Sequence, residues 1–273
     1  MSMVRESVLS KTQLGIYIEC MNAPESTLYN LPFLGKLGGD IDTDRLKAAI
    51  EAVIRAHPGL DTVLYIDAEG RVMQRQAVGT SRVEVIELSD EEFARRRQEL
   101  VRPFELLGGC LSRFELYVTP TARYFFEDFH HIIMDGSSHW MMADDMRTAY
   151  DGGELTTEER TGINVALEEA AAEGGEEYLR AKEFYGKLLD GRDCDCLPVR
   201  DVYGDVPEQG WLTHVFGIDA AAFKALRREL GVSTTAFFTS VMGFLVGKYN
   251  YRDESVIATV YDGRRLPENR SVY

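Results

Sequence analysis

The sequence predicts an α/β protein in which helices and strands form a two-layer α+β arrangement. Apolar residues at helical spacing alternate along the chain with short β-rich runs, without an internal repeat or a low-complexity tract. The 273 residues are 45% hydrophobic and 27% charged, which is ordinary for a globular protein that buries one or two cores. Both kinds of element recur along the whole chain, so we expect a mixed fold.

The first strong helix is predicted to begin after Asp42 or Thr43, either of which is a suitable N-cap. Its apolar stripe consists of Leu46, Ala49, Ile50, Val53, Ile54 and His57. The Pro-Gly pair at 58–59 ends this helix. Two β-rich runs, 62–66 and 72–76, then flank a turn-like segment, which predicts a hairpin.

A further helix is predicted after Ser89, because Glu92 stands three residues later in the capping-box pattern. We expect about ten residues of helix, stopped near Pro103. Two strands follow at 111–118 and 123–130. The second of them runs directly into the segment that holds the most reactive side chains.

The best domain boundary is the polar, acidic and glycine-containing stretch 151–175. We expect an N-terminal lobe over residues 1–160, and a linker with the first part of a C-terminal lobe over residues 161–273. The elements expected in that second part are a helix ending near Leu189, strands at 212–217 and 256–260, and helices at 219–231 and 233–248.

The formal net charge of −15 argues against a nucleic-acid partner, because phosphate contacts need clustered lysine and arginine. No apolar run approaches the roughly 18 to 20 residues that a membrane-spanning helix needs, and residues 1–10 lack the apolar core of a signal peptide. We therefore expect a cytoplasmic protein without a membrane partner. The four cysteines lack the spacing of a zinc knuckle or a redox pair.

Residues 129–138, Phe-His-His-Ile-Ile-Met-Asp-Gly-Ser-Ser, place side chains suited to proton transfer between a strand and a helix. Side chains alternate across a strand, so His130 and His131 point to opposite faces if the strand persists. Three interpretations fit the residues alone: a buried histidine pair with a turn-forming Asp-Gly, a metal site that includes Asp135, or acid-base or electrostatic catalysis. The metal site is the weakest of these, because adjacent strand residues diverge.

The helix after this segment begins beside the two histidines. Unpaired N–H groups near Gly136 can donate to an oxyanion, and glycine lets a substrate backbone approach closely. Ser137 and Ser138 fit helix caps better than nucleophiles, because no Gly-x-Ser-x-Gly elbow surrounds them.

The run His-His-Ile-Ile-Met-Asp-Gly at 130–136 matches the H-H-x-x-x-D-G motif of the condensation domains of nonribosomal peptide synthetases, a branch of the chloramphenicol-acetyltransferase-like superfamily. Four other segments resemble further motifs of this family in the same order. They are Ser10 to Gln13 with Tyr17, His57 to Thr62, Arg102 to Arg113, and Thr259 to Arg265. One such motif is a weak signal, but five in order along nearly the whole chain are specific.

The resemblance implies a chloramphenicol-acetyltransferase-like lobe followed by an incomplete second lobe of the same type. Family members are longer than this chain, so we expect a truncated second lobe and little activity from the fragment alone. The sequence departs from the family where its Arg-His-Glu becomes Ala56-His57-Pro58 and where a later arginine becomes Asp61. We therefore expect the polar contacts of that segment to differ from those of the family.

The family reaction is attack by the amine of an aminoacyl group on an acyl or peptidyl thioester, which forms an amide bond. The implied partners are donor and acceptor carrier domains, whose 4′-phosphopantetheine arms hold both substrates, and an adjacent adenylation domain. The resemblance implies no cofactor bound by the domain itself and no metal.

The resemblance also implies a role for each motif residue. The catalytic positions are His131, which accepts or holds the amine proton, His130, which orients, and Gly136. Asp135 is structural and pairs with an arginine of the second lobe, for which Arg264 is the first choice and Arg265 the second.

Three alternatives remain open. An epimerisation domain carries the same H-H-x-x-x-D-G motif, and a free-standing acyltransferase of the superfamily uses coenzyme A as the donor. An inactive domain that binds carrier proteins as a scaffold fits the altered Arg-His-Glu segment. Heterocyclisation is disfavoured, because heterocyclising members replace both histidines.

Overall fold

The computed structural model describes residues 5–192, 194, 213–260, 263–264, 269–270 and 272–273. The chain divides into two compact units, Met1–Gly175 with Asp262–Tyr273, and Glu176–Tyr261. The first unit therefore extends past residue 160, where the sequence places the boundary, and the end of the chain returns to it. The interpretation of the units as two acetyltransferase-type lobes stays a prediction.

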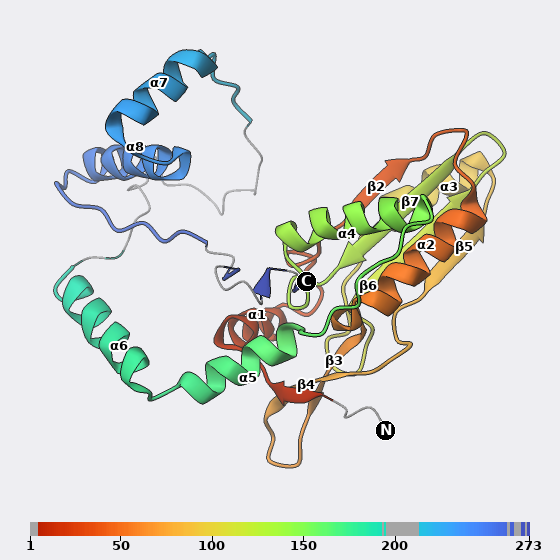
Figure 1. Ribbon diagram of the computed structural model, residues 1–273, viewed down its shortest axis with the longest axis horizontal. Coiled ribbons are helices and arrows are strands. Elements are labelled where there is room, and N and C mark those ends of the chain that lie inside the picture. Colours follow the sequence, from red (N-terminus) through yellow and green to blue (C-terminus); the bar gives the residue numbers. More distant parts are fainter. Residues whose placement is uncertain (1–4, 193, 195–212, 261–262, 265–268, 271) are drawn as a thin grey trace. The chain divides into compact units, whose positions relative to one another are not determined.

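The first unit contains two sheets and the helices that pack on them (Figure 1). The larger sheet has the strand order β2 (Phe33–Lys36), β7 (Arg123–Phe129), β6 (Ser112–Val118) and β5 (Val83–Glu87). Its neighbours are antiparallel except for β5 and β6, which run parallel. The smaller, antiparallel sheet has the order β1 (Glu6–Val8), β4 (Val72–Gln76) and β3 (Thr62–Ile66). Strands β3 and β4 confirm the predicted hairpin.

Helices cover both faces of the larger sheet. The helical elements of the first unit are α1 (Lys11–Asn22), α2 (Thr43–Ala56), η1 (Pro58–Asp61), α3 (Asp90–Arg96), η2 (Arg97–Glu99), α4 (Gly136–Tyr150) and α5 (Gly162–Ala172). Asp42 caps α2, and Ser89 and Glu92 form the predicted capping box of α3. Side-chain acceptors at these caps satisfy N–H groups that have no partner within the helix.

The main core lies between the larger sheet and the helices α2 and α4. Ile50 and Val53 of α2 and Met142 of α4 belong to one buried cluster with Phe114 and Phe129 of the sheet. Tyr117 and Phe126 lie on the opposite face of the same two strands, where they pack with Phe93 of α3. The fold class is α/β, as predicted, and this core fixes the end of β7, where the histidine motif begins.

The second unit is helical over its described residues. It contains α6 (Glu176–Leu189), α7 (Ala220–Leu230) and α8 (Thr234–Tyr249), which confirm the three predicted helices. Gly231 ends α7 in the left-handed region, with φ of 65°, where glycine is not strained.

The two strands predicted for the second unit are wrong over their described residues. Residues 213–217 and 256–260 form no strand, and Leu212 lies outside the described residues. A strand needs a neighbour to receive its backbone hydrogen bonds, and the described part of this unit offers none. Among the described residues, no single helix is long and apolar enough to cross a membrane, although α7 and α8 meet that test together as a pair bent by 87°.

Candidate active site

The histidine motif stands at the junction between β7 and α4. Strand β7 ends at Phe129, and His130 continues it by one isolated bridge to Asn30. The His130 N–H donates to the carbonyl of Leu111 at 2.9 Å, and the His131 N–H to the carbonyl of Tyr29 at 2.8 Å. The backbone N–H groups of both histidines are therefore hydrogen-bonded to adjacent segments, although the regular strand has ended.

The two imidazoles lie in opposite environments, although the regular strand that was expected to separate them ends at Phe129. His130 is 4% exposed, whereas His131 is exposed. His130 Nδ1 accepts the N–H of Ile132 at 3.1 Å, and its Nε2 lies 3.5 Å from Cys20 Sγ. Burial, with smaller contributions from His131 and Arg113, lowers the pKa of His130 to about 4. This ring is therefore neutral at pH 7, with its proton on Nε2.

The exposed ring of His131 stands beside the ring of Tyr29. The two rings meet edge to face, with centroids 6.4 Å apart. The Tyr29 hydroxyl donates to Glu19 Oε2 at 2.5 Å, and this bond raises the pKa of Tyr29 to about 12. Among the described residues, no side chain is hydrogen-bonded to the His131 imidazole, so both ring nitrogens are available to a substrate.

Gln13 supports the turn below the two histidines. Its Nε2 donates to the carbonyl of Ile132 at 3.0 Å. The same amide exchanges hydrogen bonds with the buried Gln74, at 3.0 and 2.9 Å, and Ser10 forms a capping box with it. The sequence indicates Gln13 only as part of a family motif, because its contact with the turn depends on how α1 packs.

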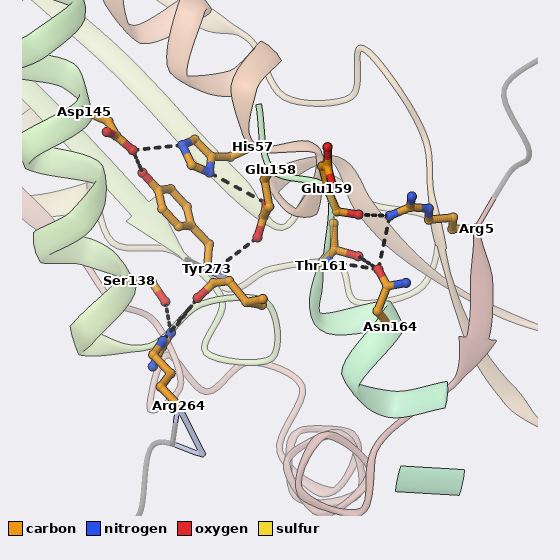
Figure 2. Close-up of polar contacts among 11 residues, drawn as sticks. Arg5, His57, Ser138, Asp145, Glu158, Glu159, Thr161, Asn164, Arg264 and Tyr273 are labelled. Atoms are coloured by element: carbon orange, nitrogen blue, oxygen red, sulfur yellow. Dashed lines mark hydrogen bonds and ion pairs between the residues drawn. The ribbon is translucent and has the colours of Figure 1, made fainter. Parts of the chain in front are cut away.

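Asp135 and Arg264 form the ion pair that the resemblance implies. Arg264 Nη1 lies 2.6 Å from Asp135 Oδ2, and Nη2 lies 3.1 Å from Oδ1. Arg264 Nη2 also donates to Ser138 Oγ at 2.8 Å, a contact that Figure 2 shows. Arg265, the second choice, lies outside the described residues.

Asp135 is also the N-cap of α4. Its Oδ1 accepts the Ser138 N–H at 2.8 Å, so this first-turn donor is not available to an oxyanion. Burial alone would raise the pKa of Asp135, but Arg264 and Ser138 outweigh it and lower the pKa to about 2. The carboxylate is therefore ionised at pH 7 and holds α4 to Arg264.

Gly136 is exposed as the first residue of α4, and a Cβ placed there would meet no atom within 4 Å. The surrounding chain therefore does not itself require glycine at this position. An incoming group that approaches the backbone here would require it.

Glu127 is a polar group near the motif that the sequence analysis missed. It is 1% exposed on β7, and its Oε1 lies 3.0 Å from Nδ1 of His139 in the first turn of α4. Burial raises the pKa of Glu127, while the bond to Glu127 raises that of His139. The sequence did carry a signal for Glu127. It alternates with Phe125 and Phe129 on one face of the strand, and that face is otherwise apolar and buried.

The described residues contain no group of three or more His, Cys, Asp or Glu side chains that could hold a metal ion. The histidine pair separates into one buried and one exposed ring. The arrangement suits proton transfer and hydrogen bonding by a single imidazole.

The mixed sheet, the histidine pair after β7 and the helix capped by the motif aspartate agree with the chloramphenicol-acetyltransferase-like fold that the sequence predicts. A model of the condensation domain family matches residues 3–272. The chain therefore belongs to the condensation domain family.

Curated relatives are multidomain synthetases. Surfactin synthase subunit 2 of Bacillus subtilis (strain 168) is 26% identical over 274 residues, which cover 97% of this chain and 7% of that protein. Tyrocidine synthase 3 of Brevibacillus parabrevis is 25% identical over 246 residues, covering 86% of this chain and 4% of that protein. The chain thus spans less than a tenth of the length of these two relatives.

Solved condensation domains share the fold. The condensation domain from the Monacolin K polyketide synthase MokA matches 90% of this chain and 60% of its own, with a TM-score of 0.71 and 18% identity. The starter condensation domain of the rhizomide synthetase RzmA matches 67% of this chain and 49% of its own, with a TM-score of 0.58 and 21% identity. At these identities, the likeness concerns the fold.

Proposed function

We propose that this chain catalyses amide bond formation between a carrier-bound acyl or peptidyl thioester and the amine of a carrier-bound aminoacyl group. The observation that carries the proposal is the separation of the motif histidines. His130 is buried and neutral, whereas His131 is exposed and has no side-chain partner among the described residues. This contrast supports the assignment of the substrate contact to His131 and not to His130.

The reaction needs one proton acceptor. The amine nitrogen attacks the thioester carbonyl carbon, and a tetrahedral centre forms as the carbonyl oxygen gains negative charge. The nitrogen then loses a proton, the carbon–sulfur bond breaks, and the phosphopantetheine sulfur leaves and takes up a proton. His131 either accepts the amine proton or hydrogen-bonds to the amine and stabilises its developing charge.

The other motif residues support this ring. His130 orients the turn, because its Nδ1 accepts the Ile132 N–H while its own ring stays neutral. Gly136 leaves room for a reacting group at the start of α4. Asp135 and Arg264 act structurally by holding the start of that helix.

The substrates and partners follow from the same proposal. The domain binds no cofactor of its own, and both reactants arrive on 4′-phosphopantetheine arms of donor and acceptor carrier domains. An adenylation domain loads the acceptor amino acid, and we place the reaction in the cytoplasm. Family membership and the multidomain relatives support these assignments.

The experiment is single-turnover transfer of a labelled acyl group from a donor carrier to an aminoacyl acceptor carrier, followed by mass spectrometry of the carrier-bound product. It is run with the 273-residue chain and with the synthetase module that we expect to carry it. Amide product that requires His131 supports the proposal. Transfer from acyl-coenzyme A alone indicates the free-standing acyltransferase, stereochemical inversion without transfer indicates an epimerase, and carrier binding without any reaction indicates a scaffold.

A further inference from the structure

A second histidine cluster lies in the first unit, outside the motif. His57, at the C-terminal end of α2, is stacked on the ring of Tyr273, with centroids 3.7 Å apart and planes inclined by 8°. Both residues are buried, at 5% and 9% exposure. This close parallel stack between two buried rings fixes the position of Tyr273.

Two carboxylates complete this cluster (Figure 2). Asp145 Oδ2, on α4, lies 2.9 Å from His57 Nε2 and accepts the Tyr273 hydroxyl at 2.7 Å. Glu158 Oε1 accepts the Tyr273 N–H at 3.1 Å, while its Oε2 lies 3.7 Å from His57 Nδ1. Tyr273 is thus held by its ring, its hydroxyl and its backbone.

The same end segment carries the arginine that pairs with the motif. The carbonyl of Val272 accepts hydrogen bonds from Arg264 Nε at 3.2 Å and Nη2 at 3.0 Å. Val272 adjoins Tyr273 in the chain, so the residue that holds the Arg264 guanidinium is itself held by the His57 cluster. The contacts therefore run from His57 through Tyr273 and Val272 to Arg264 and then to Asp135.

We propose that His57 is a positioning residue for the motif loop: its stack on Tyr273 anchors the Val272 carbonyl, which orients Arg264 toward Asp135. The proposal rests on the role assigned to the Asp135–Arg264 pair under the proposed function. An arginine held at two sides of its guanidinium loses little side-chain entropy when it pairs with a carboxylate.

The proposal also accounts for the altered sequence around His57. The carbonyl of Ala56 accepts the N–H of Glu158 at 2.7 Å, which brings this carboxylate to the imidazole. Pro58 begins η1 at a position where its missing N–H costs nothing. The segment therefore keeps His57 and builds its polar contacts from Asp145 and Glu158.

The test measures hydrogen exchange of the Arg264 guanidinium by NMR in the uniformly ¹⁵N-labelled 273-residue chain, with the signal assigned by loss in Arg264→Gln. His57→Ala and Tyr273→Leu remove the stack, and each is expected to accelerate this exchange by roughly tenfold or more. Tyr273→Phe keeps the stack and the backbone bond to Glu158 and loses only the hydroxyl, so its exchange stays near that of the unaltered chain.

Phe93→Leu is the matched control, because Phe93 is buried on the opposite face of the larger sheet and has no part in the chain of contacts. Unchanged Arg264 exchange in both stack variants, or equal acceleration by Phe93→Leu, overturns the proposal. If His57→Ala fails to fold, Tyr273→Leu is the deciding variant. Tyr273 lies at one edge of the core and leucine keeps an apolar side chain there, so we expect this variant to fold. The measurement needs no turnover, so its failure is distinguishable from failure of the carrier assay.

Discussion

Arg264 binds Asp135 through two hydrogen bonds, of 2.6 and 3.1 Å, that join positions 129 residues apart in the chain. The pair is bidentate, and the planar guanidinium of arginine suits this geometry better than the ammonium of lysine does. Asp135 also caps α4, so one carboxylate fixes both the start of the helix and the returning end of the chain. The histidine turn lies immediately before it.

Asp135→Asn is expected to reduce the free energy of unfolding more than His131→Ala does. The asparagine keeps a side-chain oxygen for the helix cap but leaves the partly buried guanidinium without its counter-charge, at a cost of about 2 kcal/mol. His131 is exposed, so its truncation costs little. Chemical denaturation of the two variants checks this order, and equal midpoints would count against a structural role for the pair.

Acidification is expected to remove the contribution of Asp135 at the low end of the pH range. Because the folded-state pKa of Asp135 is lowered, to about 2, its stabilisation is complete above the ordinary carboxyl pKa of 3.8 and is lost as pH falls through about 2. The effect is about 1 to 2 kcal/mol after allowance for solvent. Arg264→Gln should flatten the stability profile between pH 4 and 2, which urea titrations would measure.

His130 is expected to weaken the fold over a higher pH range. Its lowered pKa of about 4 means that the unfolded chain takes up a proton first, so stability present above pH 6.5 is lost as pH falls toward 4. The loss is about 2 to 3 kcal/mol, since the ring is buried. In His130→Gln this part of the stability profile should become flatter. A profile identical to that of the unaltered chain would contradict the buried, neutral assignment.

Local patterns in the sequence predict the histidine geometry well. Alternation along a strand predicts that His130 and His131 separate, but β7 ends at Phe129, so the exposure of His131 also depends on the turn that follows. The capping signals of Ser89 and Asp42 are local as well. Such features depend on neighbouring residues. The strand expected at 256–260 fails for the opposite reason, because a strand exists only with a paired neighbour that no local pattern reveals.

Contacts between distant residues were not predictable from the residues themselves. The pairing of Asp135 with Arg264 was expected only through the family resemblance. Nothing in the sequence indicates that Gln13 reaches the carbonyl of Ile132, or that His57 stacks on Tyr273. These contacts depend on the packing of whole elements, which sequence periodicity does not specify.

His131→Ala is expected to reduce amide formation by about two orders of magnitude or more while leaving the fold intact. The reason is that the proposed function assigns the amine proton to the exposed imidazole of His131. Pre-steady-state transfer between carriers measures the chemical step, and circular dichroism checks the fold. His139→Ala is the matched control, because it removes a second histidine beside the motif whose imidazole is paired with Glu127. It should not reduce transfer as His131→Ala does. Unaltered transfer by the His131 variant would remove this residue from the mechanism.

Arg113→Met is expected to be among the most destabilising single changes, at about 3 to 5 kcal/mol. Arg113 Nη1 lies 2.8 Å from Oδ2 of Asp128, which is fully buried and also accepts from Asn30 at 2.7 Å. Burial already raises the pKa of Asp128, so a carboxylate without its arginine would take up a proton. The penalty should therefore shrink as pH falls from 7 to 5.

Lys47→Met is the control for this change, because the pair between Lys47 and Glu51 is exposed and 3.9 Å long, and should contribute below about 1 kcal/mol. The double variant Arg113→Met with Asp128→Leu should regain much of the lost stability, since the uncompensated charge is gone. Denaturation at pH 7 and 5 separates the two causes. A penalty that is independent of pH and persists in the double variant would place the cost in the other contacts of Arg113. These are its hydrogen bonds to the carbonyls of Arg102 and Pro103, at 2.8 and 2.7 Å, and its packing over Phe104, where the guanidinium carbon lies 3.6 Å from the ring centroid.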